Sequence, residues 1–196
     1  MKSSIPEDTR SAILTAAWDM MEQTGRQDIG MAEIARAAGV SRQTLFLAFG
    51  GRSGLLLAMV RHKDTRTTHV QRMMAFGALP FTRDNLLKFL DVWLEYLPVV
   101  YPVAILLDAA AVTEAEAAAA IGDRMKVALL SAFTRYLTRM AEAGELPAGR
   151  APEPLAQVIW TLVHPQAWRL LVQECGWTPE AFRKDRLSLV AQLVGA

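Results

Sequence analysis

The chain has 196 residues and a single cysteine, and its 21 Lys and Arg residues against 20 Asp and Glu residues leave a net charge of +1. This length suits one or two domains with a substantial hydrophobic core. A nearly neutral total argues against a protein that binds polyanions over its whole surface, and one cysteine excludes an intrachain disulfide framework.

The basic residues are unevenly distributed along the chain. Residues 36–72 contain seven Arg and Lys residues and only one acidic residue, Asp64. A local patch of this kind can attract phosphates even when the whole chain is balanced. The sequence therefore directs attention to this segment as a candidate nucleic-acid surface.

No segment has the composition of a targeting signal or a membrane span. Residues 1–10 are polar, and the longest apolar run, residues 97–107, contains Pro98 and Pro102. A bilayer span needs about 20 apolar residues, and a signal peptide needs an apolar core. We therefore expect a soluble, cytoplasmic protein with no membrane partner.

The hydrophobic residues recur with a helical period, and no segment alternates as a strand does. This pattern predicts an all-α fold of about nine helices, with Pro98 and Pro102 bracketing a turn, Gly122 as a possible interruption and Pro165 as a bend inside a helix. The expected helices cover residues 7–24 (ended by Gly25), 31–38, 42–48, 52–75, 83–97, a short segment ending near 111, 113–143, 153–174 and 179–194.

The second and third expected helices are joined by the tight turn Gly39-Val40-Ser41. Gly39 can adopt the positive φ that ends a helix, and Ser41 is a favourable N-cap for the helix that follows. Gly30 precedes the second helix, with Glu33 in the position of a capping box. Two short helices joined by a turn that contains glycine are typical of a helix-turn-helix.

The third expected helix has one apolar face and one face suited to DNA. Leu45 and Phe49 are four residues apart and share the face that must point to the core. Gln43 and Leu47 point the opposite way, with Thr44 and Phe46 on the flanks and Arg42 near the helix start. A Gln can pair with adenine, and Thr or Leu can touch a thymine methyl. With the two caps and the next basic residue, the candidate DNA-binding residues are Gly30, Ser41, Arg42, Gln43, Thr44, Phe46, Leu47 and Arg52.

Residues 10–56, RSAILTAAWDMMEQTGRQDIGMAEIARAAGVSRQTLFLAFGGRSGLL, resemble the N-terminal DNA-binding domain of the TetR (tetracycline-repressor-like) family of transcriptional regulators. The matching elements include Glu33-Ile34-Ala35, the turn from Ala38 to Ser41, Thr44-Leu45 and Phe49. The resemblance implies a homodimeric regulator, usually a repressor, that binds a palindromic operator in double-stranded DNA. It also implies a divergent C-terminal domain that often binds a small effector.

The sequence departs from the family pattern at positions that usually contact DNA phosphates. The family usually has Tyr at Phe46, His at Ala48, and Thr or Ser at Gly30, whereas Arg52 replaces a usual Lys and keeps its charge. Phosphate contacts position a protein on DNA and carry much of its affinity. We therefore expect Arg42 and Arg52 to carry more of the phosphate binding than is usual.

The last two expected helices predict a dimer. The helix at 153–174 is apolar nearly all round and the helix at 179–194 is also rich in apolar residues, so each is expected to be buried on more than one side. A closed symmetric dimer is the default way to cover such faces, and in the TetR family these helices usually form the interface. The expected interface residues are Leu155, Ile159, Leu162, Phe182, Leu189, Val190 and Leu193.

The aromatic residues in the C-terminal part allow two interpretations of their role. They could form an ordinary core, or they could line a mostly apolar effector pocket with His164 and Asp108 as occasional polar contacts. The bend expected at Pro165 would leave free carbonyl groups that a ligand could use. The candidate ligand-binding residues are Trp93, Tyr96, Asp108, Trp160, His164 and Trp168.

We find no pattern that indicates catalysis, a metal site or a cofactor. The chain lacks a phosphate-cradling glycine loop, zinc-ligand spacing and a nucleophile elbow, so no enzyme activity and no cofactor are expected. The sequence predicts a DNA-binding domain at residues 1–52 and an effector-binding and dimerisation domain at residues 53–196. The alternative is a TetR-like small-molecule binding protein whose DNA binding has weakened.

Overall fold

The computed structural model describes residues 5–24 and 29–195, and within these ranges all regular structure is helical. The chain divides into two compact units, which are described separately. The first unit is Met1–Thr67 together with Pro102–Ile121, and the second is Thr68–Tyr101 together with Gly122–Ala196. Gly25, the expected end of the first helix, lies outside the described residues.

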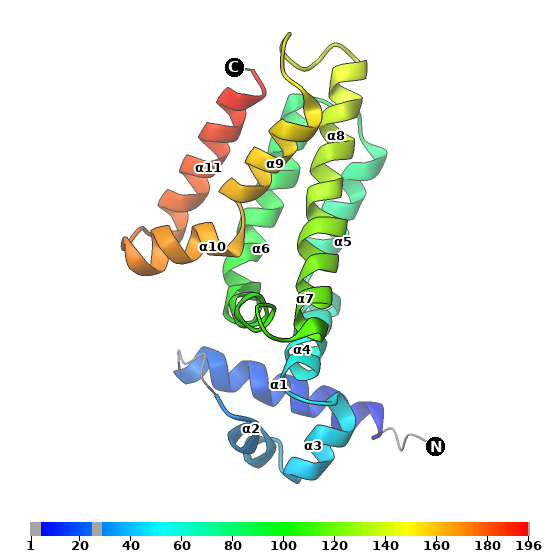
Figure 1. The fold of residues 1–196 in the computed structure, drawn as a ribbon, viewed down its shortest axis with the longest axis vertical. Coiled ribbons are helices and arrows are strands. Elements are labelled where there is room, and N and C mark those ends of the chain that lie inside the picture. The colour runs from blue at the N-terminus through cyan, green and yellow to red at the C-terminus, as the bar shows by residue number, and fades with distance from the viewer. Residues whose placement is uncertain (1–4, 25–28, 196) are drawn as a thin grey trace. The chain divides into compact units, whose positions relative to one another are not determined.

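The first unit begins with three helices arranged as the sequence predicts. They are α1 (Glu7–Thr24), α2 (Met31–Ala37) and α3 (Arg42–Phe49), with α2 packed against both α1 and α3 (Figure 1). Helix α4 (Arg52–Arg66) packs against α1, where the Trp18 indole N–H donates to the Met59 carbonyl at 3.0 Å. The shared core is apolar and includes Ile13, Leu14, Trp18, Met21, Ile34, Leu45, Leu55 and Met59.

The second unit is built around the N-terminal part of α6 (Arg83–Ala110). The elements that pack against this part are α5 (His69–Ala75), a 3-10 turn (Phe76–Ala78), α8 (Ser131–Glu142), α9 (Pro152–Leu162) and α11 (Pro179–Leu193). The Phe89 ring meets the Phe133 ring edge-on at 5.7 Å between centroids. The Arg183 guanidinium binds the Asp91 carboxylate in a bidentate pair at 2.6 and 2.7 Å, which ties α11 to α6.

Helix α6 corrects the expected turn at Pro98 and Pro102, because it runs without a break from Arg83 to Ala110. The two prolines are four residues apart, so the backbone N–H groups that they lack fall on one face of the helix. Extensive burial offsets this cost: Leu94, Leu97 and Val103 are at most 2% exposed. Local proline signals were therefore overridden by packing.

Among the described residues, α6 is also the single helix long and apolar enough to cross a membrane by length and composition alone, although the bent pair α3 and α4 would pass the same test if taken as one span. In the structure 67% of the most apolar window of α6 is buried inside the protein. That degree of burial is the pattern of a core helix.

Two other expected helices are broken. The helix expected at 52–75 ends at Arg66, because Thr67 is extended (φ −120°, ψ 156°), and a separate helix, α5, begins at His69. Thr67 and Thr68 are poor helix formers, which accounts for a break at this point. The helix expected at 153–174 also ends early, at Leu162, and Pro165 opens a new short helix instead of bending a long one.

The remaining helices follow the sequence more closely. The region expected at 113–143 forms α7 (Ala115–Gly122), a π-helical stretch (Asp123–Leu130) and α8, so that Gly122 marks a change of helix type. After α9 come α10 (Pro165–Trp168) and a second π-helical stretch (Arg169–Glu174). The last helix, α11, has the expected Thr178 N-cap, whose hydroxyl accepts from the Ala181 N–H at 3.1 Å.

Candidate nucleic-acid interface

The turn between α2 and α3 has the geometry that its sequence predicts. Gly39 has φ +65°, the left-handed region that ends a helix at low cost for glycine. The Val40 N–H then donates to the Ala35 carbonyl at 2.9 Å, and Ser41 takes an extended conformation at the N-cap of α3. This arrangement is a helix-turn-helix.

Both helices are capped by their own side chains. The Ser41 Oγ accepts from the Thr44 N–H at 2.9 Å and lies 2.8 Å from the Thr44 hydroxyl. At α2, the Glu33 carboxylate accepts from the Gly30 N–H at 2.9 Å. These contacts confirm the two caps predicted from sequence, and they show that Ser41, Thr44 and Gly30 already have structural roles.

The inner face of α3 is fixed by burial and by one arginine. Leu45 is 0% and Phe49 6% exposed, as the helical spacing predicts. Arg10 donates to the Ala48 carbonyl at 2.9 Å, and its guanidinium lies 4.4 Å from the centre of the Phe49 ring. This cation–π contact and hydrogen bond hold the C-terminal end of α3 against α1. The sequence analysis did not identify Arg10 in this role.

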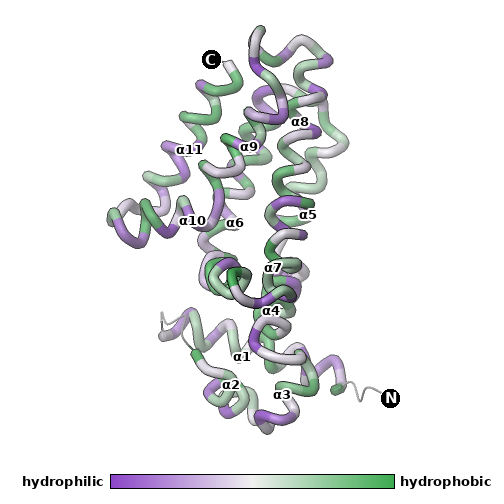
Figure 2. The backbone as a smooth tube through the Cα atoms, in the orientation of Figure 1, coloured by the Kyte–Doolittle hydropathy of each residue, from purple (hydrophilic) through white to green (hydrophobic). Residues whose placement is uncertain are grey.

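The outer face of α3 carries the candidate reading residues. Arg42 and Gln43 are exposed, and Phe46 and Leu47 are 59% and 66% exposed. Thr44 is half-buried. Figure 2 shows the hydrophilic start of α3 followed by hydrophobic residues. One turn and a half of helix therefore presents a cation, an amide and two apolar groups to the outside.

Helix α4 begins with three residues whose roles are structural. The Arg52 guanidinium donates to the Ile29 carbonyl at 2.5 Å and so ties the start of α4 to the segment before α2. The buried Ser53 hydroxyl donates to the Glu114 carboxylate at 2.5 Å. A Cβ added at Gly54 would lie 1.9 Å from the Phe49 carbonyl oxygen, so only glycine allows α4 to approach α3 this closely.

Neither contact of Ser53 and Gly54 was predicted. The available signal was Gly54 itself, because a glycine inside a helix is less stable than alanine and can indicate a packing reason. The partner of Ser53 is 61 residues away in sequence, and no local pattern could have identified it.

Histidine 62 on α4 faces α1, where its Nε2 lies 3.3 Å from the Thr15 hydroxyl. Burial lowers the pKa of His62, and the nearby Arg66 lowers it further. The imidazole is therefore neutral at pH 7. Within residues 5–24 and 29–195, no group of three or more His, Cys, Asp or Glu side chains is placed to hold a metal ion.

Five of the six candidate ligand-binding residues lie in the second unit, whereas Asp108 belongs to the first. Trp93 and Tyr96 are buried and meet edge-on, with ring centroids 6.4 Å apart. Trp160 meets His164 at 5.0 Å between ring centroids, and Trp168 meets the Phe182 ring at 5.1 Å. The structure thus places these residues in packed aromatic contacts.

The polar groups of this region are largely used within the protein. At the break between α9 and α10, the Val163 carbonyl accepts from the Trp93 indole N–H at 3.0 Å. The His164 Nδ1 accepts from the Gln166 N–H at 3.2 Å and so caps α10. The break does free a carbonyl, as a proline predicts, but Trp93 occupies it. Among the described residues, the indole nitrogens of Trp160 and Trp168 are buried without a hydrogen-bond partner.

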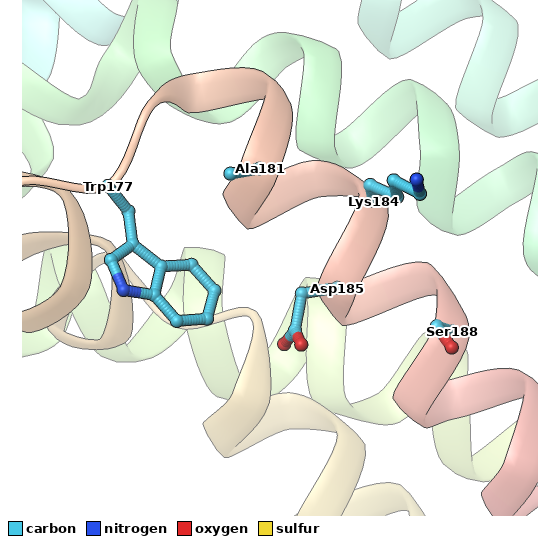
Figure 3. Close-up of a pocket in the computed structure, with 5 residues that line it drawn as sticks. All are labelled: Trp177, Ala181, Lys184, Asp185 and Ser188. Atoms are coloured by element: carbon cyan, nitrogen blue, oxygen red, sulfur yellow. The ribbon is translucent and has the colours of Figure 1, made fainter.

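An open groove of about 510 Å³ lies along α11 and contains none of the six candidate ligand residues. Figure 3 shows Trp177 and Asp185 projecting toward the same space. Its lining residues are Trp177, Ala181, Lys184, Asp185 and Ser188.

The expected dimer residues divide into two groups. Leu155, Ile159, Phe182 and Val190 are between 0% and 6% exposed, so they belong to the core of their own subunit. Leu162, Leu189 and Leu193 are half-buried. The helical period correctly marked apolar positions, but it could not assign a face to the core or to a partner, because these helices are apolar on several sides.

Comparisons with known proteins agree with this geometry. Residues 13–59 match the family model described as bacterial regulatory proteins, tetR family. A structure from Rhodococcus sp., assigned to the TetR-family transcriptional regulators, is 25% identical, with 97% of this chain and 100% of that chain covered and a TM-score of 0.68. No curated protein sequence matches the chain.

Two further structures share the fold at lower identity. The transcriptional regulator FadR from Bacillus subtilis, solved in complex with stearoyl-CoA, is 19% identical, covers 94% of this chain and 98% of its own, and has a TM-score of 0.70. NalD, the secondary repressor of the MexAB-OprM multidrug efflux pump in Pseudomonas aeruginosa, is 19% identical, covers 96% of both chains and has a TM-score of 0.67. Together with the helix-turn-helix, these comparisons show that residues 13–59 match the tetR family of bacterial regulatory proteins and that the chain shares its fold with TetR-family transcriptional regulators.

Proposed function

We propose that this chain is a sequence-specific DNA-binding repressor that acts as a homodimer and is released by a small, mostly apolar effector. The observation that carries the proposal is the outer face of α3, where Arg42, Gln43, Phe46 and Leu47 are exposed while Leu45 and Phe49 fix the helix from inside. Such a helix fits the major groove, where Gln can pair with adenine and an apolar group can meet a thymine methyl.

The surrounding charge supports the same proposal. Arg36 and Arg42 are exposed near the turn, and residues 36–72 carry one acidic residue among seven basic ones. Arg52 is bound to the Ile29 carbonyl through one nitrogen, so any phosphate contact must use another part of its guanidinium. We therefore assign the larger share of phosphate binding to Arg42.

A twofold partner is needed for a palindromic operator, because two reading helices bind half-sites about one DNA turn apart. The buried residues Leu155, Ile159, Phe182 and Val190 cannot supply such a face. We place it instead on exposed and half-buried neighbours: Val158 is 46% exposed on α9, while Leu162 and Leu189 remain half-buried. The α11 groove beside Trp177 would then be covered by the partner subunit.

The effector proposal rests on the apolar character of the second unit. Its aromatic residues are packed, so an effector must bind a rearranged conformation more tightly than the packed one to shift the population. The stearoyl-CoA bound to Bacillus subtilis FadR shows that a structure of the same fold accepts a ligand with a long apolar chain. The residues proposed to surround an effector here are Trp93, Tyr96, Trp160, His164 and Trp168.

The test is selection of DNA from a random-sequence pool by the purified full chain, followed by measurement of affinity and of protein chains per DNA duplex. We expect one palindromic sequence and two chains per site. Failure to enrich any sequence at low salt would contradict the DNA-binding proposal and favour the small-molecule binding protein. Enrichment of a non-palindromic site by a single chain would contradict the dimer alone.

A further inference from the structure

Two consecutive large apolar side chains are exposed on α3. Phe46 is 59% and Leu47 66% exposed on a helix of only eight residues. A single exposed apolar residue needs no explanation, but two adjacent ones on a surface that otherwise carries Arg42 and Gln43 form a small patch that does.

This exposure is built into the packing of the helix. Turning α3 to bury Phe46 and Leu47 would bring Leu45 and Phe49, now 0% and 6% exposed, into water. The hydrogen bond from Arg10 to the Ala48 carbonyl and the Ser41 cap hold both ends of the helix in the present orientation. The Phe46 and Leu47 side chains therefore remain exposed as long as the packing of α3 is kept.

The charge around the patch selects the kind of partner. Arg42 is exposed one turn before Phe46 on the same helix, and Arg36 is exposed on α2, within a segment that has one acidic residue. A partner must combine negative charge with apolar groups that a helix can reach. The major groove does so, because phosphates border it and the C5-methyl of thymine is the apolar group that projects into it.

We propose that Phe46 and Leu47 read thymine by contact with its C5-methyl group, so that each operator half-site has thymine opposite them. The inference rests on the proposed DNA-binding function. The Thr44 hydroxyl, 2.8 Å from the Ser41 Oγ, is already engaged in the cap. Hydrogen-bond reading by α3 is therefore left mainly to the exposed Gln43, and methyl reading to the apolar pair.

The experiment replaces each thymine of the selected site with uracil, which keeps every hydrogen-bonding group and lacks only the methyl. Using the full chain, we expect uracil at one or two positions of a half-site to raise Kd about fourfold per contacted methyl. In Phe46→Ala or Leu47→Ala the penalty at the corresponding position disappears. Met74→Ala, at a residue 75% exposed on α5, is the matched control and keeps the penalty.

The outcomes separate this inference from the function on which it rests. If no DNA is enriched, both fail. If the chain binds its selected DNA but uracil at every position leaves Kd unchanged, or the penalty persists in both variants, methyl reading is overturned and DNA binding stands. A selected half-site without thymine overturns it as well. So does a pair of variants that lose self-association while their DNA affinity is unchanged, since the patch would then contact protein.

Discussion

Helix α3 and the aromatic residues of the second unit (Trp93, Tyr96, Trp160, His164 and Trp168) differ in how far their side chains are used in contacts within the protein. On α3, Arg42 and Gln43 are exposed and the helix is held by other residues. In the second unit, Trp93 donates to the Val163 carbonyl and His164 caps α10. The indole N–H and the imidazole nitrogen that could bind a ligand are therefore used in hydrogen bonds within the protein. The comparison teaches that the exposed face of α3 is already formed, whereas a ligand proposed to bind the aromatic residues would have to compete with their internal contacts.

The largest expected effect concerns α3 and its contact with α4. Gly54→Ala places a Cβ 1.9 Å from the Phe49 carbonyl oxygen, a backbone atom that cannot move without shifting α3. We expect a loss of about 3 kcal/mol in the free energy of unfolding, as for a severe case of overpacking, and loss of specific DNA binding. Denaturant unfolding and a DNA titration measure the two effects.

Gly122→Ala is the matched control, because its added Cβ meets nothing within 4 Å and its φ of −60° is helical. Replacing a helical glycine by alanine stabilises by up to about 1 kcal/mol. If Gly54→Ala is as stable as Gly122→Ala and still binds DNA, then the contact between α4 and α3 does not fix the reading helix.

Trp93→Phe tests the internal hydrogen bond of the second unit. It removes the indole N–H and leaves the Val163 carbonyl unpaired, which we expect to lower the free energy of unfolding by about 1–3 kcal/mol. Trp160→Phe is the control, since the Trp160 indole nitrogen is buried without a partner in the described part of the chain. Equal stability of the two variants, measured by denaturant unfolding, would contradict a structural role for Trp93.

Arg42→Ala tests the charge on the reading surface. One lost phosphate contact should reduce the slope of log K against log salt by about 0.9, with a similar loss of affinity for all sequences. Arg135→Ala, an exposed arginine on α8 in the second unit, should leave the slope unchanged. Titrations at several salt concentrations decide the matter, and identical slopes for all three proteins would remove Arg42 from the interface.

The smallest expected effect is on the pH dependence of the free energy of unfolding, to which one histidine in each unit contributes. Burial lowers the pKa of His62 and of His69, each helped by a nearby arginine. The unfolded chain therefore binds protons first as the pH falls below about 6.5, so stability should decrease from that pH downward. Unfolding at pH 7.5 and 5.5 should show a smaller difference for His62→Gln and His69→Gln; an unchanged difference would mean that neither histidine contributes.

The sequence predicted the helix-turn-helix because its signals are local. Gly39 and Ser41 mark the turn and the cap, and the spacing of Leu45 and Phe49 defines the inner face. The exposure of Gln43 and Leu47 follows from that spacing. These features depend on residues within one or two helical turns, where propensity and periodicity are informative.

The rest depended on partners distant in sequence. The continuity of α6 through Pro98 reflects extensive burial along the helix, which no local signal carries. The contact of Ser53 with Glu114 and the donation from Trp93 to the Val163 carbonyl join segments 61 and 70 residues apart. The composition of α9 and α11 could not assign Ile159 or Phe182 to the core, because apolar residues suit a core and an interface equally.

The central claim, that α3 reads base edges through its outer face, is tested most directly by the base-by-base affinity of Gln43→Ala for the selected DNA. We expect a loss of about 1–3 kcal/mol and relaxed preference at one base pair of each half-site, with all other positions unchanged. Gln71→Ala, an exposed glutamine on α5, should retain the full preference. An unaltered preference in Gln43→Ala at every base pair would contradict the account.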